Sequence, residues 1–276
     1  MQGLSFHIPT QSKVNYLNSL LNVGFDVLDC GSFVSPKAVP QLADTPQVLN
    51  SIDMSQSNTK LLVIVANEIG AENASEFDSI SYLGFPFSIS ETFQLRNTNK
   101  TIQQSFNSLT NINKIAHSHN KESVVYLSMG FGNPYNEKWS ESIVYDWVSK
   151  LSDNGFRIIS LSDTIGAAKP NQISKIFNQL KKDFTHLELG VHLHTRPDNY
   201  LQNIKAAFES GCNRFDSAMK GYGGCPFAAD KLTGNLPTES LIDFLKSQNV
   251  KLNIDQTKFN EAFALADSVF NHSSVE

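Results

Sequence analysis

Residues 156–192 have the sequence FRIISLSDTIGAAKPNQISKIFNQLKKDFTHLELGVH, which is the pattern of a strand, a helix and a second strand. The two end runs, 156–161 and 187–192, are short and almost continuously apolar, as is typical of strands buried on both faces of a parallel sheet. Between them, residues 171–184 carry apolar side chains at helical spacing, and Pro170 stands where a helix start tolerates proline. This succession predicts two parallel strands joined by a right-handed crossover.

The same alternation extends over most of the chain. Further strands are predicted at 25–30, 61–66, 80–85, 123–128 and 213–217, and further helices at 13–24, 140–155, 197–211, 237–249 and 256–270. No GxGxxG motif follows an early strand, so the sequence lacks the fingerprint of a dinucleotide-binding fold. These alternating strands and helices, spread over 276 residues, predict an α/β fold of the (β/α)8 TIM-barrel type. We expect a single domain over residues 1–276, with helices at its C-terminal end.

The start of the chain departs from this pattern. The first predicted element is already a helix, at 13–24, so the pattern contains seven strands where closure of a barrel requires eight. We therefore expect the first strand of the barrel to precede Met1 and to be missing from the sequence.

Composition narrows the classes of function. The chain is 40% hydrophobic with a formal net charge of −5, and it has neither a basic run nor an apolar stretch near the about 20 residues that span a bilayer. We expect no nucleic-acid or membrane partner. The three cysteines form no CxxC pair, which favours a reducing cytoplasm over a disulfide scaffold. Cys30 and Cys212 have apolar neighbours typical of core thiols, whereas Cys225 lies in the polar, glycine-rich stretch GYGGCPFAADKLTGN (221–235).

Several polar residues fall where predicted strands end, which is where TIM barrels carry their chemistry. They are Asp29, Ser160, Asp163, His192, His194 and Asp216, and the stretch with Cys225 and Asn235 follows the last of them.

The pair His192 and His194 is the most informative, because residues i and i+2 of a strand point to the same face. Two imidazoles on one face form half of a divalent-metal site, although hydrogen-bonded histidines at a strand end would show the same spacing. Asp163 could equally cap the helix that follows it. Asn235 after Gly234 is also common in turns, and Cys225 could be a small loop residue. The joint position of these residues at predicted strand ends favours the functional interpretation.

Longer motifs carry a resemblance to a known family. The segments GSFVSPKAVPQ (31–41), SLSDTIGAAKP (160–170), GVHLHTRPDN (190–199), GYGGCPFA (221–228) and TGNLPTESL (233–241) occur in the order found in hydroxymethylglutaryl-CoA lyases. The sequence resembles these enzymes over nearly its whole length. They lie within the wider group of metal-dependent TIM-barrel lyases and Claisen-type synthases.

The resemblance implies roles for individual residues. Metal ligands are implied for His192, His194 and Asn235, and substrate contacts for Gln2, Ser32 and Ser160. Catalytic roles are implied for Cys225, Asp163, His192, Asp29 and Glu239. Of these, Cys225 matches a mobile-loop cysteine that takes part in proton transfer, and Asp29 stands where the family usually has a glutamate near the metal.

The family reaction cleaves 3-hydroxy-3-methylglutaryl-CoA into acetyl-CoA and acetoacetate, a step of leucine degradation and ketone-body metabolism. The resemblance thus implies a carbon–carbon lyase that acts on this or a related hydroxyacyl-CoA, with Mg²⁺ or Mn²⁺ as cofactor. A cation would gather the substrate oxygens, and the carbanion left by cleavage needs an acid such as a thiol. Analogy with the family also implies a homodimer, whereas the cytoplasmic location rests on the cysteine usage.

Some motifs depart from the family pattern. Thr195, Arg196 and Pro197 replace the usual Asp-Thr-Tyr after the second histidine, and Asn133 stands where well-studied lyases have cysteine. The family's catalytic arginine and one ligand aspartate would precede Met1. Two alternatives to the lyase therefore stay open. One is a Claisen-type synthase that joins an acyl-CoA to a 2-oxo acid, and the other is a catalytically inactive barrel that binds acyl-CoA.

Overall fold

The computed structural model describes residues 1, 4, 6–195, 199–223 and 234–270. The chain falls into two compact units. The first comprises Met1–Leu83, Ile115–Glu122 and Leu245–Glu276, and the second comprises Gly84–Lys114 and Ser123–Phe244. The single-domain organisation expected from the sequence stays a prediction.

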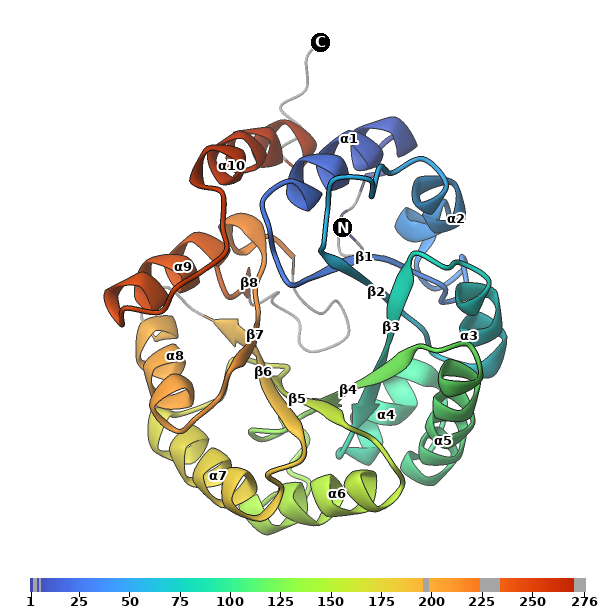
Figure 1. Cartoon of the computed structure of the whole chain (residues 1–276). Helices are drawn as coiled ribbons and strands as arrows, with labels where there is room; N and C mark the ends of the chain where they lie inside the picture. The colour runs from blue at the N-terminus through green and yellow to red at the C-terminus, as the bar shows by residue number, and fades with distance from the viewer. Residues whose placement is uncertain (2–3, 5, 196–198, 224–233, 271–276) are drawn as a thin grey trace. The chain divides into compact units, whose positions relative to one another are not determined.

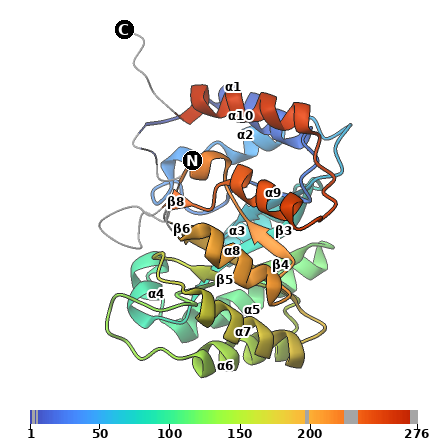
Figure 2. The same ribbon diagram turned by 90° about the vertical axis from the view of Figure 1, so that its left-hand side faces the viewer.

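The first unit contains two parallel strands and the helices next to them. Its elements are α1 (Thr10–Leu21), β1 (Val27–Ser32), η1 (Pro40–Leu42), α2 (Thr45–Leu49), β2 (Lys60–Ile64), α3 (Glu68–Ser75) and α10 (Gln256–Phe270). Strands β1 and β2 pair in parallel, with an irregularity in register between Asp29 and Gly31. Helices α1 and α10 lie side by side in Figures 1 and 2. The rings of Tyr16 and Phe270 join them edge to face, with centroids 5.3 Å apart.

The second unit is built on four adjacent parallel strands. Its elements are α4 (Glu91–Thr98), α6 (Glu141–Asp153), β5 (Ile158–Asp163), α7 (Pro170–Asp183), β6 (Glu188–Thr195), α8 (Tyr200–Glu209), β7 (Arg214–Asp216), η2 (Met219–Gly221) and β8 (Gly234–Asn235). Four elements have residues in both units: β3 (Ile80–Ser88), α5 (Ile102–Ser118), β4 (Glu122–Ser128) and α9 (Thr238–Ser247). Strand β5 pairs with β4 and β6, and β6 pairs with β7, all in parallel. Figure 1 shows helices α6, α7 and α8 outside these strands, and Figure 2 shows them in the side view.

The burial of β5 and α7 confirms the pattern from which the fold was predicted. Every residue of β5 is buried, as an almost continuously apolar run requires. Helix α7 buries Ile173, Ile176, Phe177 and Leu180 along one stripe and begins at Pro170. The polar residues Ser160 and Asp163 therefore lie inside the protein, where each polar atom needs a hydrogen-bond partner.

All seven predicted strands are present, with ends that shift by a few residues. Strand β1 continues beyond Asp29 to Ser32, so Asp29 lies within the strand and not at its end. The structure also contains elements that the sequence pattern does not predict, which are helices α2, α3, α4 and α5 and the short strand β8. In the part of the chain that the structure describes, no helix has the length and apolarity to cross a membrane.

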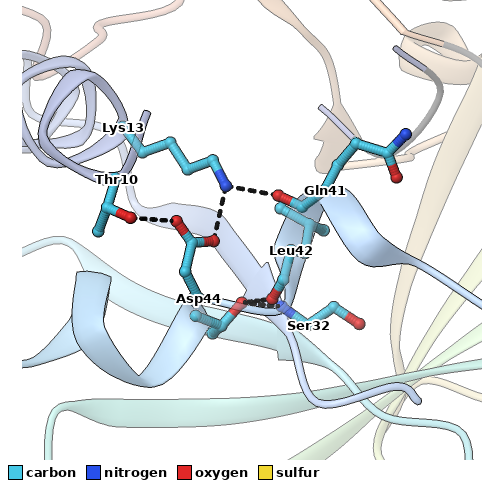
Figure 3. A network of polar contacts seen from close by, with 7 residues as sticks. Thr10, Lys13, Ser32, Gln41, Leu42 and Asp44 are labelled. Atoms are coloured by element: carbon cyan, nitrogen blue, oxygen red, sulfur yellow. Dashed lines mark hydrogen bonds and ion pairs between the residues drawn. The ribbon is translucent and has the colours of Figure 1, made fainter. Parts of the chain in front are cut away.

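A buried lysine joins α1 to the segment that follows β1, as Figure 3 shows. The Lys13 side chain is 2% exposed, and its Nζ lies 2.6 Å from Asp44 Oδ1 and also donates to the Gln41 carbonyl. Thr10 donates its hydroxyl to the other carboxylate oxygen of Asp44. Burial raises the pKa of Asp44, but the hydrogen bonds from Lys13 and Thr10 outweigh it and hold this pKa below its usual value.

We expect Lys13→Met to lower the free energy of unfolding by about 3 kcal/mol, because it leaves a mostly buried carboxylate without its cation. A carboxyl group whose pKa is lowered in the folded state stabilises the fold above its unfolded pKa and loses that contribution as the pH falls through the folded pKa. The difference between wild type and variant should therefore shrink below about pH 4. Urea unfolding at neutral and acid pH measures both effects. An equal loss in Lys37→Met, at an exposed lysine, would contradict this account.

Candidate active site

His192 and His194 lie on β6, between β5 and β7. Their ring centroids are 5.3 Å apart, so both side chains lie on one side of the strand, as the i, i+2 spacing predicts. The His192 ring also meets the Tyr126 ring edge to face, at 5.7 Å between centroids. The paired imidazoles form the centre of the candidate site.

The His194 imidazole is fixed by a backbone carbonyl. Its side chain is buried, and Nδ1 lies 3.0 Å from the carbonyl oxygen of Thr164. Burial, and to a lesser extent the neighbouring His192, lowers the pKa of His194 to about 4. The ring is therefore neutral near neutral pH, with the Nδ1 proton donated to Thr164, so that Nε2 carries the lone pair. Metal-ligating histidines usually have this arrangement.

Strand β8 brings Asn235 to the histidines. It pairs antiparallel with β6, and Asn235 is the register partner of His194. The Asn235 Nδ2 donates to the Tyr222 carbonyl at 2.9 Å, which fixes the orientation of the amide. Its Oδ1 is the only atom of the side chain that could ligate a cation. The residue pattern leaves Asn235 open between a turn residue and a functional one, because a strand of two residues has no recognisable pattern, and the family resemblance implies the ligand role.

The residues that the structure brings together fit a divalent cation only in part. His194 offers a neutral, oriented nitrogen, and Asn235 offers an amide oxygen beside it. Among the described residues, no cluster of three or more His, Cys, Asp or Glu side chains could hold an ion by itself. The donor set of two imidazoles and one amide therefore stays a prediction that the geometry supports.

Asp163 is buried at the end of β5 and holds the loop before α7. Its Oδ1 accepts the backbone N–H of Ala167 at 2.8 Å, and its Oδ2 accepts that of Ala168 at 2.9 Å. Burial raises the pKa of this carboxyl group to about 6, against backbone hydrogen bonds that lower it. The geometry favours a role in fixing this loop, whose Thr164 carbonyl in turn orients His194.

Ser160 and Asp216 come from the strands on either side of β6. The Ser160 hydroxyl donates to Asp216 Oδ2 at 2.9 Å, and His192 Nδ1 lies 3.5 Å from the same oxygen. Asp216 stands at a predicted strand end, but the sequence pattern assigns it no role, because its contacts depend on the register across three strands.

Glu239, in the first turn of α9, holds the turn that leads to the cysteine-bearing stretch. Its Oε2 accepts the backbone N–H of Lys220 at 3.0 Å. Lys220 has a φ of +56°, and Gly221 and Gly223 follow with φ of +66° and +101°. The Glu239 carboxylate thus stabilises a left-handed backbone turn in η2.

The other predicted site residues belong to the first unit or are not described. The Ser32 hydroxyl donates to the Ile64 carbonyl and accepts from the Val34 N–H, so it is engaged in the loop after β1. Asp29 lies on β1 with its side chain exposed. Gln2 and Cys225 fall outside the described residues. The roles of all four stay predictions.

We expect Gly223→Ala to lower kcat about 10–100-fold, because a Cβ at this position would lie 2.8 Å from Asn235 Nδ2 and displace the amide. Gly155→Ala is the matched control. Gly155 also has a positive φ, of +83°, but its Cβ would meet no atom within 4 Å. Steady-state kinetics and thermal unfolding of both variants separate displacement of Asn235 from backbone strain. Equal kinetic losses in the two variants would show that Asn235 is not involved.

A family model and individual relatives both match this chain, and they point to the same family. A family model described as HMGL-like matches residues 2–265. Hydroxymethylglutaryl-CoA lyase YngG of Bacillus subtilis is 32% identical over 262 residues, which cover 95% of this chain and 87% of the relative. The cytoplasmic 3-hydroxy-3-methylglutaryl-CoA lyase of Homo sapiens is 32% identical over 264 residues, covering 95% of this chain and 70% of the relative.

Solved structures that resemble this chain come from the same family. An HMG-CoA lyase from Acinetobacter baumannii, in complex with coenzyme A and 3-methylmalate, matches with a TM-score of 0.90 at 30% identity. The match covers 100% of this chain and 89% of that one. The predicted α/β fold of the TIM-barrel type is confirmed by this likeness.

Proposed function

The chain belongs to the HMGL-like family, and from this membership we propose that it cleaves 3-hydroxy-3-methylglutaryl-CoA to acetyl-CoA and acetoacetate. The observation that carries the proposal is the placement of His192 and His194 side by side on β6, with Asn235 paired to His194 on β8. Three residues to which the resemblance gives a ligand role thus lie close together in the second unit.

In this proposal His192, His194 and Asn235 hold a divalent cation, Mg²⁺ or Mn²⁺. When bound, such a cation acts as a Lewis acid toward the oxygen atoms of the substrate. The protein's contribution is to orient the donors. The Thr164 carbonyl sets the tautomer of His194, and the Tyr222 carbonyl sets the amide of Asn235.

Cleavage requires two proton movements. The substrate hydroxyl passes its proton to a solvent water as the carbon–carbon bond breaks, a ketone forms on the acetoacetate fragment, and the bonding electrons pass to the acetyl-CoA carbon. We assign delivery of a proton to that carbon to Cys225 Sγ, because a thiol is a suitable acid at this stage. In this scheme Asp163 and Glu239 fix loops, and Asp29 keeps the catalytic role that the family resemblance implies.

The acyl-CoA substrate, the cytoplasmic location and the homodimeric state belong to the same proposal. The likeness to named lyases, one of them solved in complex with coenzyme A, supports the acyl-CoA substrate. Light scattering of the purified protein measures the oligomeric state. A monomer at assay concentration would remove the dimer from the proposal without affecting the reaction.

The test is a coupled assay of acetoacetate. Purified protein is incubated with 3-hydroxy-3-methylglutaryl-CoA and Mn²⁺, and acetoacetate is followed through its NADH-dependent reduction. We expect turnover in the ordinary range of about 1–10³ s⁻¹, lost on chelation with EDTA and restored by Mn²⁺. Thiol release from acetyl-CoA and a 2-oxo acid, without lyase activity, would instead establish a Claisen-type synthase. Binding of the thioester without either reaction would establish an inactive protein.

A further inference from the structure

We propose that Asp216, itself held by Ser160, is a positioning residue that orients His192 so that the Nε2 of this histidine faces the reaction site. The group that His192 then ligates, a divalent cation, is taken from the proposed function, and in this respect the inference rests on that proposal. It concerns the second unit alone, in which β5, β6 and β7 each supply one of the three residues.

The contacts form a chain across neighbouring strands. His192 and Asp216 are register partners on β6 and β7, and Ser160 lies on β5, on the other side of β6. The Ser160 hydroxyl is completely buried and donates to Asp216 Oδ2 at 2.9 Å, which fixes the carboxylate. The same oxygen lies 3.5 Å from His192 Nδ1. A carboxylate held from one side thus stands opposite one nitrogen of the imidazole.

The burial of His192 indicates which edge of the ring meets the site. The side chain is 32% exposed, yet Nδ1 is buried and completes no hydrogen bond with the described residues in this geometry. The exposed part of the ring is therefore not the Nδ1 edge. A small movement of Asp216 would let Nδ1–H donate to it and satisfy a buried polar atom that is otherwise costly.

His194 supports the same interpretation, because its Nδ1 already meets an acceptor, the Thr164 carbonyl, at 3.0 Å. The two imidazoles would then be held in the same way, one by a carbonyl and one by a carboxylate, and each would present Nε2. A carboxylate partner orients a ligating histidine and increases its basicity. Ser160, for which the family resemblance implies a substrate contact, takes the role of holding Asp216.

The experiment measures cation binding and the His192 tautomer without substrate, so that its outcome does not depend on turnover. Mn²⁺ affinity is measured by isothermal titration calorimetry for wild type, Asp216→Asn, Ser160→Ala and the double variant. The ring nitrogens of ¹⁵N-histidine-labelled, metal-free protein report the tautomer by NMR. Asp243→Asn, at an exposed position of α9, and Ser123→Ala, at a buried position of β4, are the matched controls.

We expect Asp216→Asn to weaken Mn²⁺ binding about 10–100-fold and to change the His192 tautomer, while thermal unfolding stays close to that of Asp243→Asn. Ser160→Ala should weaken binding about fivefold, and it should add nothing in the Asp216→Asn background because it acts through that carboxylate. Wild-type affinity with an unchanged tautomer in Asp216→Asn would overturn the proposal. Loss of affinity with an unchanged tautomer would also overturn it, since Asp216 would then be a ligand itself.

Discussion

Replacing His194 with alanine should lower kcat for acetoacetate formation by about 10³-fold or more, which corresponds to about 4 kcal/mol of lost transition-state stabilisation. The reason is the state in which the structure holds this side chain. His194 is buried, its burial lowers its pKa to about 4, and Nδ1 is engaged by Thr164. A neutral imidazole with one oriented lone pair is suited to ligate a cation, and alanine offers no donor in its place.

His186→Ala is the control for the His194 variant. His186 is an exposed histidine of the same unit, and its Nε2 contacts Ser152 at 2.8 Å. We expect its kinetics and its Mn²⁺ affinity to match those of wild type. If His194→Ala kept more than a tenth of wild-type kcat at a saturating cation concentration, His194 would not be a metal ligand of the reaction.

Cys225→Ser should lower kcat about 10²–10⁴-fold and leave Mn²⁺ affinity near that of wild type, because a hydroxyl is a far weaker acid than a thiol. This role comes from the family resemblance, and Cys225 lies outside the described residues. The structure does show the surroundings of the other two thiols, Cys30 and Cys212. Cys30 and Cys212 are buried, and burial raises the pKa of Cys212 to about 12, so that neither thiol is suited to donate a proton near neutral pH.

Cys212→Ala is the control for the Cys225 variant, since it removes a buried, inert thiol. Steady-state kinetics and calorimetry of the two variants separate proton delivery from cation binding. Activity of Cys225→Ser within tenfold of wild type would rule out Cys225 as the proton donor. A parallel loss of Mn²⁺ affinity would instead make it a ligand.

The fold was predictable because it depends on local patterns that a sequence shows directly. The six residues of β5 are all buried, and its apolar run shows this without knowledge of its neighbours. Helices such as α4 were missed because their sequences carry weak patterns: α4 buries only Phe93 and Gln94 and depends on capping by Ser90. Strand β8 consists of two residues that pair only because β6 lies beside them.

The site was predictable only in part, for a similar reason. The shared face of His192 and His194 follows from the period of a strand. The contact of Asp216 with Ser160 depends on the register of three strands, which no local pattern fixes. The engagement of both Asp163 oxygens by Ala167 and Ala168 likewise depends on the path of the loop, and the sequence left that aspartate with two alternative roles.

The most direct test of the proposed lyase activity is product analysis by NMR. Substrate labelled with ¹³C is incubated with wild-type protein and Mg²⁺, and all labelled products are followed together. The proposed function predicts acetyl-CoA and acetoacetate in equal amounts, at a rate that Asp243→Asn shares and His194→Ala does not. Unchanged 3-hydroxy-3-methylglutaryl-CoA in the presence of folded, cation-loaded protein would contradict it.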